Sequence, residues 1–111
     1  MTHPQFQIKT GKDSQFYFNL TAKNGQVILS SEGYKAKNSC ENGIESVKKN
    51  SQVDDHFERK EAKNGQHYFV LKAGNGEIIG KSEMYTTKAA MENGIESVKT
   101  NSPLATTVDI D

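Results

Sequence analysis

The chain has 111 residues, an ordinary length for one small domain. Fourteen basic and fourteen acidic side chains give a formal net charge of zero, so no overall field would draw the chain to nucleic acid or to an anionic membrane. The single cysteine, Cys40, excludes an internal disulfide and a multi-cysteine metal site. No N-terminal targeting pattern and no stretch of ~20 apolar residues is present, so a cytoplasmic protein is expected.

Three antiparallel strands are predicted at the start of the chain, near residues 6–10, 15–22 and 26–31. The last two are separated by Asn24-Gly25, a pair that favours the type I′ hairpin turn, and Asp13-Ser14 marks the earlier turn. At period two the middle strand places three side chains on one face, which is predicted to be the core: Phe18, Leu20 and Ala22. Ile28 is expected to join this core.

An amphipathic helix is predicted after the strands. Its apolar or small residues recur at i, i+4, i+7, i+8 and i+11, and they are Ala36, Cys40, Gly43, Ile44 and Val47. A glycine inside a helix costs roughly 1 kcal/mol relative to alanine, so Gly43 is predicted to permit a close approach of the helix to the sheet. The N-terminus of this helix lacks a good capping residue, with Asn38 or Ser39 as later candidates.

The whole pattern is repeated. Residues 6–52 match residues 57–103 at 25 of 47 positions without a gap at an offset of 51, and the helical segment Glu41–Lys48 recurs unbroken as Glu92–Lys99. The second copy therefore predicts its own three strands, near 57–61, 66–73 and 77–82, with core residues Phe69, Leu71, Ala73 and Ile79. Its helix repeats the stripe with Met91, Gly94, Ile95 and Val98, and Thr86 or Thr87 is available as a cap.

One three-stranded sheet with one helix is small for independent stability. The predicted fold is therefore α+β: two tandem β-β-β-α repeats forming one pseudo-symmetric domain over residues 1–111, with helices packed on an antiparallel sheet. The alternation in Thr107–Asp111 predicts a last strand.

The repeated motifs resemble those of the YegP-like family of small bacterial proteins. They comprise Tyr17-Phe18, Asn24-Gly25, Ser31-Glu32, Tyr34 and the segment Asn42–Lys48, all recurring 51 residues later. The resemblance implies one sheet in which C-terminal strands cross between halves, so residues 106–110 are expected to cross, and the segment near 54–60 is expected to enter the other half's sheet. It also implies a monomer, because two tandem copies mimic a dimer. It implies no activity.

No catalytic, cofactor-binding or metal-binding constellation is evident, and the chain is not predicted to be an enzyme. Cys40 occupies the stripe position that Met91 holds in the second copy, which predicts a buried thiol. The three histidines, His3, His56 and His67, lack the spacing of metal ligands. The shared helix signature contains no nucleophile and base pair, and Asn42 and Asn93 are its least explained residues.

The sheet face away from the helices is the candidate binding surface. Its predicted apolar members are Tyr17, Val27, Leu29, Tyr68, Val70 and Ile78, joined by Asn19 and Lys72. Such a face predicts a non-catalytic interaction module that binds another protein or a copy of itself, although the same residues are also simply good strand formers. The alternative is a weak single-stranded nucleic-acid binder, in which the tyrosines stack on bases and Lys9, Lys60 and Lys72 approach phosphates, against which the zero net charge argues. A third possibility, an enzyme, would need a pocket between the two halves.

Overall fold

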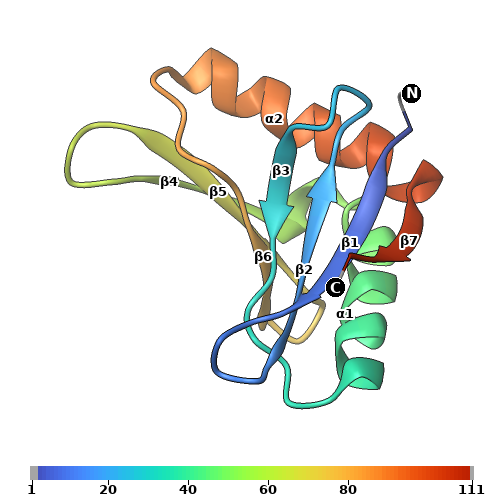
Figure 1. Ribbon diagram of the computed structural model, residues 1–111. Helices are drawn as coiled ribbons and strands as arrows, with labels where there is room; N and C mark the ends of the chain where they lie inside the picture. Colours follow the sequence, from blue (N-terminus) through green and yellow to red (C-terminus); the bar gives the residue numbers. More distant parts are fainter. Residues whose placement is uncertain (1–2, 111) are drawn as a thin grey trace.

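The computed structural model describes residues 3–110 and has one seven-stranded sheet in the order β4-β5-β6-β3-β2-β1-β7, with two α-helices packed on it (Figure 1). The elements in chain order are β1 (Gln5–Thr10), β2 (Phe16–Thr21), β3 (Val27–Ser30), α1 (Lys37–Asn50), η1 (Asp54–His56), β4 (Phe57–Glu61), β5 (His67–Lys72), β6 (Ile78–Lys81), α2 (Lys88–Asn101), η2 (Ser102–Leu104) and β7 (Thr106–Asp109). The predicted α+β fold with two β-β-β-α repeats is confirmed.

The two repeats meet in the middle of this sheet. Strand β3 of the first repeat pairs antiparallel with β6 of the second through Ser30 and Lys81. These two residues are themselves 51 positions apart, so they are equivalent in the repeat and the pseudo-twofold axis passes between them. The two halves therefore share one sheet, and their apolar side chains form one core cluster.

The C-terminal strand crosses between halves, as the resemblance implied. Although it follows α2 in the second repeat, β7 pairs in parallel with β1 of the first, in a register that places Gln5 opposite Thr106 and Ile8 opposite Asp109. The segment after α1 forms η1 and then enters the second half as β4, which pairs with β5. It therefore becomes the first strand of the second repeat rather than an additional strand.

Both helices bury the predicted stripes against the same face of the sheet (Figure 1). The largest fully buried side chains of the sheet are Phe6, Phe18, Leu20, Leu29, Phe69 and Leu71. Edge-to-face aromatic pairs recur in the two halves, with ring centroids 5.8 Å apart for Phe6 and Phe18 and 5.6 Å apart for Phe57 and Phe69. One member of the predicted stripe is wrong: Ala36 is exposed, because α1 begins only at Lys37.

The helix glycines allow a tyrosine to pack against each helix. A Cβ atom added at Gly43 would collide with the Tyr34 hydroxyl, and one added at Gly94 would collide with that of Tyr85. Each tyrosine lies just beyond β3 or β6, where its backbone bridges to the start of β2 or β5, and its ring stacks on a core phenylalanine. The close approach that the glycines predicted therefore has a tyrosine ring as its partner.

Candidate functional site

One face of the sheet is covered by the helices, and we refer to the other as the open face. Because side chains alternate along each strand, the strand registers determine its members. They are Gln5, Gln7, Lys9, Tyr17, Asn19, Thr21, Val27, Ser30, Glu58, Lys60, Tyr68, Val70, Lys72, Ile78, Lys81, Thr106 and Val108.

The prediction for Leu29 is wrong, because this side chain lies in the core. Strict alternation from Val27 placed it on the open face, but the pairing of β2 with β3 shifts register between Leu20 and Thr21. As a result Leu20 pairs with Leu29 while Thr21 pairs with Val27, and Ile28 is the extra residue of a bulge. Leu29 is fully buried and fills the space beside Gly80, where an added Cβ would come within 2.7 Å of it.

The other five predicted residues lie on the open face, with unequal exposure. Tyr17, Val27 and Tyr68 are partly exposed, and Ile78 is 42% exposed. Val70 is 3% exposed although it is not part of the core cluster. Its cross-strand neighbours, Glu58 and Lys81, flank it on both sides.

The open face is more polar and more basic than the sequence predicted. Among the strand residues on it, the charged side chains are Lys9, Lys60, Lys72, Lys81 and Glu58. Glu58 lies 2.5 Å from the Lys72 ammonium and 3.5 Å from that of Lys60, and hydrogen bonding to Lys72 lowers the pKa of its carboxyl group. With four lysines and one glutamate on these strands, the neutral chain places an excess of positive charge on this face.

The two tyrosines of the open face are held by different contacts. The Tyr17 hydroxyl donates a 2.7 Å hydrogen bond to Asp13, which raises the pKa of the phenol and lowers that of the carboxyl group. Its ring packs beside Gly11, where an added Cβ would come within 2.6 Å of a ring atom, and beside Gly33, where an added Cβ would be 3.0 Å from the ring. The Tyr68 ring has the Lys81 ammonium 5.1 Å from its centroid.

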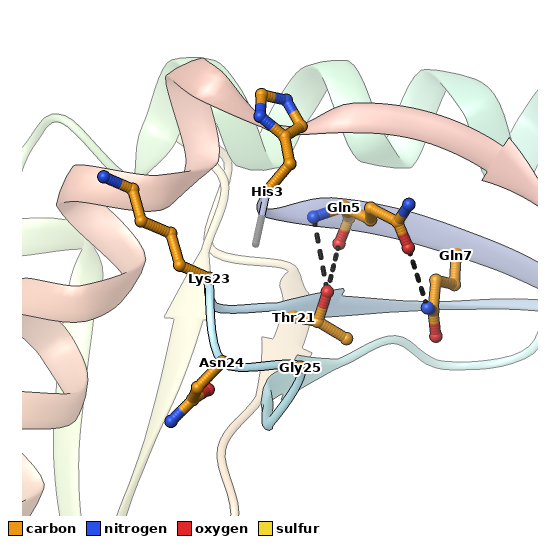
Figure 2. A pocket seen from close by; sticks show the side chains of 7 residues that line it. All are labelled: His3, Gln5, Gln7, Thr21, Lys23, Asn24 and Gly25. Atoms are coloured by element: carbon orange, nitrogen blue, oxygen red, sulfur yellow. Dashed lines mark hydrogen bonds between the residues drawn. The ribbon is translucent and has the colours of Figure 1, made fainter. Parts of the chain in front are cut away.

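A polar hollow of about 250 Å³ lies at one end of the open face, beside β1 and the β2–β3 turn. Figure 2 shows its lining residues: His3, Gln5, Gln7, Thr21, Lys23, Asn24 and Gly25. The Thr21 hydroxyl forms hydrogen bonds with the backbone of Gln5, and the Gln7 side-chain amide donates a 3.0 Å hydrogen bond to the Gln5 side-chain oxygen (Figure 2). Sequence reasoning missed this hollow, although the alternation of glutamines with Phe6 and Ile8 in β1 marks their side chains as outward-facing.

Among residues 3–110, the cysteine and histidine side chains lie apart from one another. Cys40 is fully buried, and burial raises the pKa of its thiol to about 11. The histidines lie on separate elements: His3 contacts Thr106 at 2.9 Å, His56 contacts Asn50 at 2.7 Å, and His67 begins β5. Within residues 3–110, no group of three acidic, histidine or cysteine side chains could hold a metal ion. Neither α-helix in this range is long and apolar enough to cross a membrane.

Comparison with known proteins gives the chain close relatives. The family described as "Domain of unknown function (DUF1508)" matches twice, at residues 12–58 and 62–109. UPF0339 protein PA0329 of Pseudomonas aeruginosa is 54% identical, with 91% of this chain and 92% of that protein covered. UPF0339 protein YegP of Escherichia coli K12 is 48% identical, with 94% of each chain covered.

Two solved structures share the fold. The solution NMR structure of YegP from E. coli, described as a protein of unknown function, has a TM-score of 0.92 at 46% identity and covers 98% of this chain and 94% of its own. That of UPF0339 protein SO3888 from Shewanella oneidensis has a TM-score of 0.91 at 44% identity, with 98% and 92% covered. The chain therefore belongs to the UPF0339 family of bacterial proteins built from tandem DUF1508 repeats, a family whose function is uncharacterised.

Proposed function

We propose that this chain is a non-catalytic binding module that holds an anionic partner on the open face of its sheet. The observation that carries the proposal is the excess of lysine over glutamate among the strand residues of that face. The whole chain is formally neutral, so the balancing acidic side chains lie elsewhere. A concentration of one sign of charge on one face attracts partners of the opposite sign at short range even when the net charge is zero.

The arrangement of the opposite face supports this assignment. Two acidic side chains of the helical side are engaged with cations of the same side: Asp109 accepts from Lys37 at 2.6 Å, and Asp54 accepts from Lys99 at 2.7 Å. On the open face the single strand carboxylate, Glu58, contacts two of the four lysines. Lys9 and Lys81 are exposed, and neither forms an ion pair with another of the residues that the structure describes.

A binding role fits the site better than a catalytic one. The thiol of Cys40 is buried and its raised pKa keeps it protonated near neutral pH, so it is a poor nucleophile. The polar side chains that line the hollow of Figure 2 are three amides, a hydroxyl, one lysine and the imidazole of His3, groups that donate or accept hydrogen bonds. A second copy of the chain is a poor occupant of the open face, because two such faces would bring like charges together.

The test uses inorganic polyphosphate, an anion without aromatic groups, titrated into ¹⁵N-labelled protein at low salt. Saturable amide shifts are expected on β1, β2, β4, β5 and β6, with affinity falling steeply between about 50 and about 200 mM salt. The double variant Lys9→Glu/Lys60→Glu is expected to abolish these shifts. Lys49→Glu/Lys88→Glu, which changes two exposed helix lysines and the net charge equally, is expected to retain them.

Two outcomes contradict the proposal. An unshifted spectrum at low salt would show that the open face does not hold anions. Equal loss of binding in both double variants would show that net charge, and not the open face, governs the interaction.

A further inference from the structure

The open face carries the same lysine and tyrosine pair in each half. Lys9 lies directly across from Tyr17 in the β1–β2 pair, and Lys60 lies directly across from Tyr68 in the β4–β5 pair. These residues are 51 positions apart, so the pair is repeated by the pseudo-twofold axis. Side chains directly opposite each other on one face have Cβ atoms about 5 Å apart. Each half therefore presents a partly exposed aromatic ring with a cation beside it.

The registers also determine how far apart the two pairs lie. One row of side chains crosses β2, β3, β6 and β5 at a single level, and it consists of Asn19, Ser30, Lys81 and Val70. Tyr17 lies two residues from this row, and Tyr68 lies two residues from it in the opposite direction because β2 and β5 run antiparallel. Three strand spacings and four residue rises separate the rings by about 20 Å along a diagonal of the face.

The diagonal between the rings is itself basic. Lys81 lies on the central row, and its ammonium is close to the Tyr68 ring. The carboxylates near the diagonal are already engaged: Glu58 with lysines, and Asp13 as acceptor from the Tyr17 hydroxyl. A partner that contacts both pairs must therefore be extended, anionic along its length, and equipped with flat rings at intervals.

We propose that the anionic partner is a single-stranded nucleic acid, with bases stacked on Tyr17 and Tyr68 and phosphates beside Lys9, Lys60 and Lys81. This inference rests on the proposed function and names its partner class. Stacking of bases on sheet tyrosines beside a basic track is the way in which sheet platforms bind single strands. A duplex keeps its bases stacked inside and would leave both tyrosines without a ring to contact. An acidic protein segment without aromatic residues would use the lysines but would have no ring to stack on the tyrosines.

The experiment compares two fluorescein-labelled twelve-unit strands by anisotropy at low salt. One is oligothymidylate, and the other is an abasic strand with the same number of phosphates. Because stacking contributes ~1–3 kcal/mol per base, the abasic strand is expected to bind at least about fivefold more weakly. Tyr17→Leu and Tyr68→Leu are each expected to weaken oligothymidylate binding by about fivefold to a hundredfold and to leave abasic binding unchanged.

Conservative variants and a second polyanion distinguish a failure of the nucleic-acid inference from a failure of the proposed anion binding. Tyr17→Phe and Tyr68→Phe keep the ring and are expected to retain oligothymidylate binding. Unchanged abasic binding by the leucine variants would show that these variants do not act by unfolding the sheet. Equal binding of the oligothymidylate and abasic strands would overturn the inference, as would equally tight binding of a twelve-residue oligoglutamate. In either case polyphosphate binding to the open face would leave the proposed function standing, whereas failure of all these polyanions to bind would overturn both.

Discussion

The two halves of the molecule share a core but end in different sheet edges. In the first half, β7 pairs with the outer edge of β1, and the Ile8 side chain of β1 lies in the core and is 2% exposed. In the second half, β4 is the last strand of the sheet, and the residue equivalent to Ile8 is Arg59. The Arg59 guanidinium donates two hydrogen bonds to Glu92 of α2, at 2.6 and 3.0 Å. The two repeats thus share the same core, whereas the residue at each sheet edge suits its surroundings: apolar where β7 covers the edge and charged where the edge is open.

No strand of the described sheet pairs with the outer edge of β4, and the order of the elements along the chain explains why. The residues equivalent to β7 in the first repeat are 55–58, and they must continue into the second repeat. They form part of η1 and the beginning of β4, so they cannot lie beside β4 as β7 lies beside β1. An uncovered strand edge risks pairing with other chains, and charged side chains on such an edge reduce that risk. The comparison indicates that Arg59 adapts the repeat to an open edge.

The largest expected effect comes from exchanging these two edge residues. Ile8→Arg places a charge in the core beside the edge that β7 covers and removes a buried apolar side chain, so we expect it to lower the free energy of unfolding by about 3–5 kcal/mol. Arg59→Ile exchanges an exposed ion pair for an apolar side chain and is expected to change it by at most about 1 kcal/mol. Urea unfolding monitored by circular dichroism measures both.

Ile8→Val is the control for the first exchange, with an expected loss of about 0.5–1.5 kcal/mol from the lost methylene alone. Similar small effects of Ile8→Arg and Arg59→Ile would contradict the comparison. Such a result would mean that β7 separates easily from β1 and that the two sheet edges are equally exposed in solution.

The helix N-termini also differ between the two halves, and this difference predicts a smaller effect on the free energy of unfolding. Thr87 caps α2 by accepting from the Ala90 amide at 3.0 Å, whereas Ala36 at the equivalent position of α1 makes no side-chain cap. Both residues have an extended backbone, with φ of −133° and −128°, so a threonine at 36 would adopt the same cap geometry. We expect Thr87→Ala to lower and Ala36→Thr to raise the free energy of unfolding by about 1 kcal/mol each.

Thr86→Ala is the matched control for the caps, because Thr86 is exposed and precedes the cap; its expected effect is within about 0.5 kcal/mol. Thermal or urea unfolding of the three variants measures these changes. If Ala36→Thr destabilised the protein, the start of α1 would differ in solution from that of α2.

Most of the fold could be predicted from the sequence because the repeat states each pattern twice. Strand alternation identified the cores of β2 and β5, and the helix stripe identified Gly43 and Gly94 as contact points. Leu29 was misplaced because a bulge shifts register by one residue, and one residue of shift moves a side chain to the other face. Its counterpart Gly80 carries no side chain, so the second repeat could not reveal the error.

The charge of the open face was harder to predict than its tyrosines. Net charge is a sum over the chain and says nothing of how lysines divide between faces. That division depends on which strands are adjacent, and Lys9 and Lys81 share a face only because β3 and β6 join the two halves. The crossing of β7 likewise depends on contacts between residues about a hundred positions apart, which no local pattern contains.

The smallest expected effect is the pH dependence of the β4 edge. The Arg59 guanidinium lowers the pKa of the Glu92 carboxyl group, and Lys99 followed by Arg59 lowers that of Asp54. A carboxylate whose pKa is lowered on folding stabilises the protein above its unfolded pKa, near 4, and this contribution is lost as pH falls through the folded value. Because the Glu92 carboxylate is about half exposed and its ion pair with Arg59 is screened by solvent, we expect Arg59→Met to lower the free energy of unfolding by less than about 1 kcal/mol at pH 7.

This difference between the wild type and Arg59→Met should shrink toward zero between about pH 5 and about pH 3, as both carboxyl groups become protonated. Urea unfolding at several pH values measures it, and Arg59→Lys, which keeps the charge but not the paired hydrogen bonds, should give an intermediate difference. A difference that stayed constant down to pH 3 would contradict this prediction, because it would show that the effect of Arg59 on stability does not depend on the charge of Glu92 or Asp54.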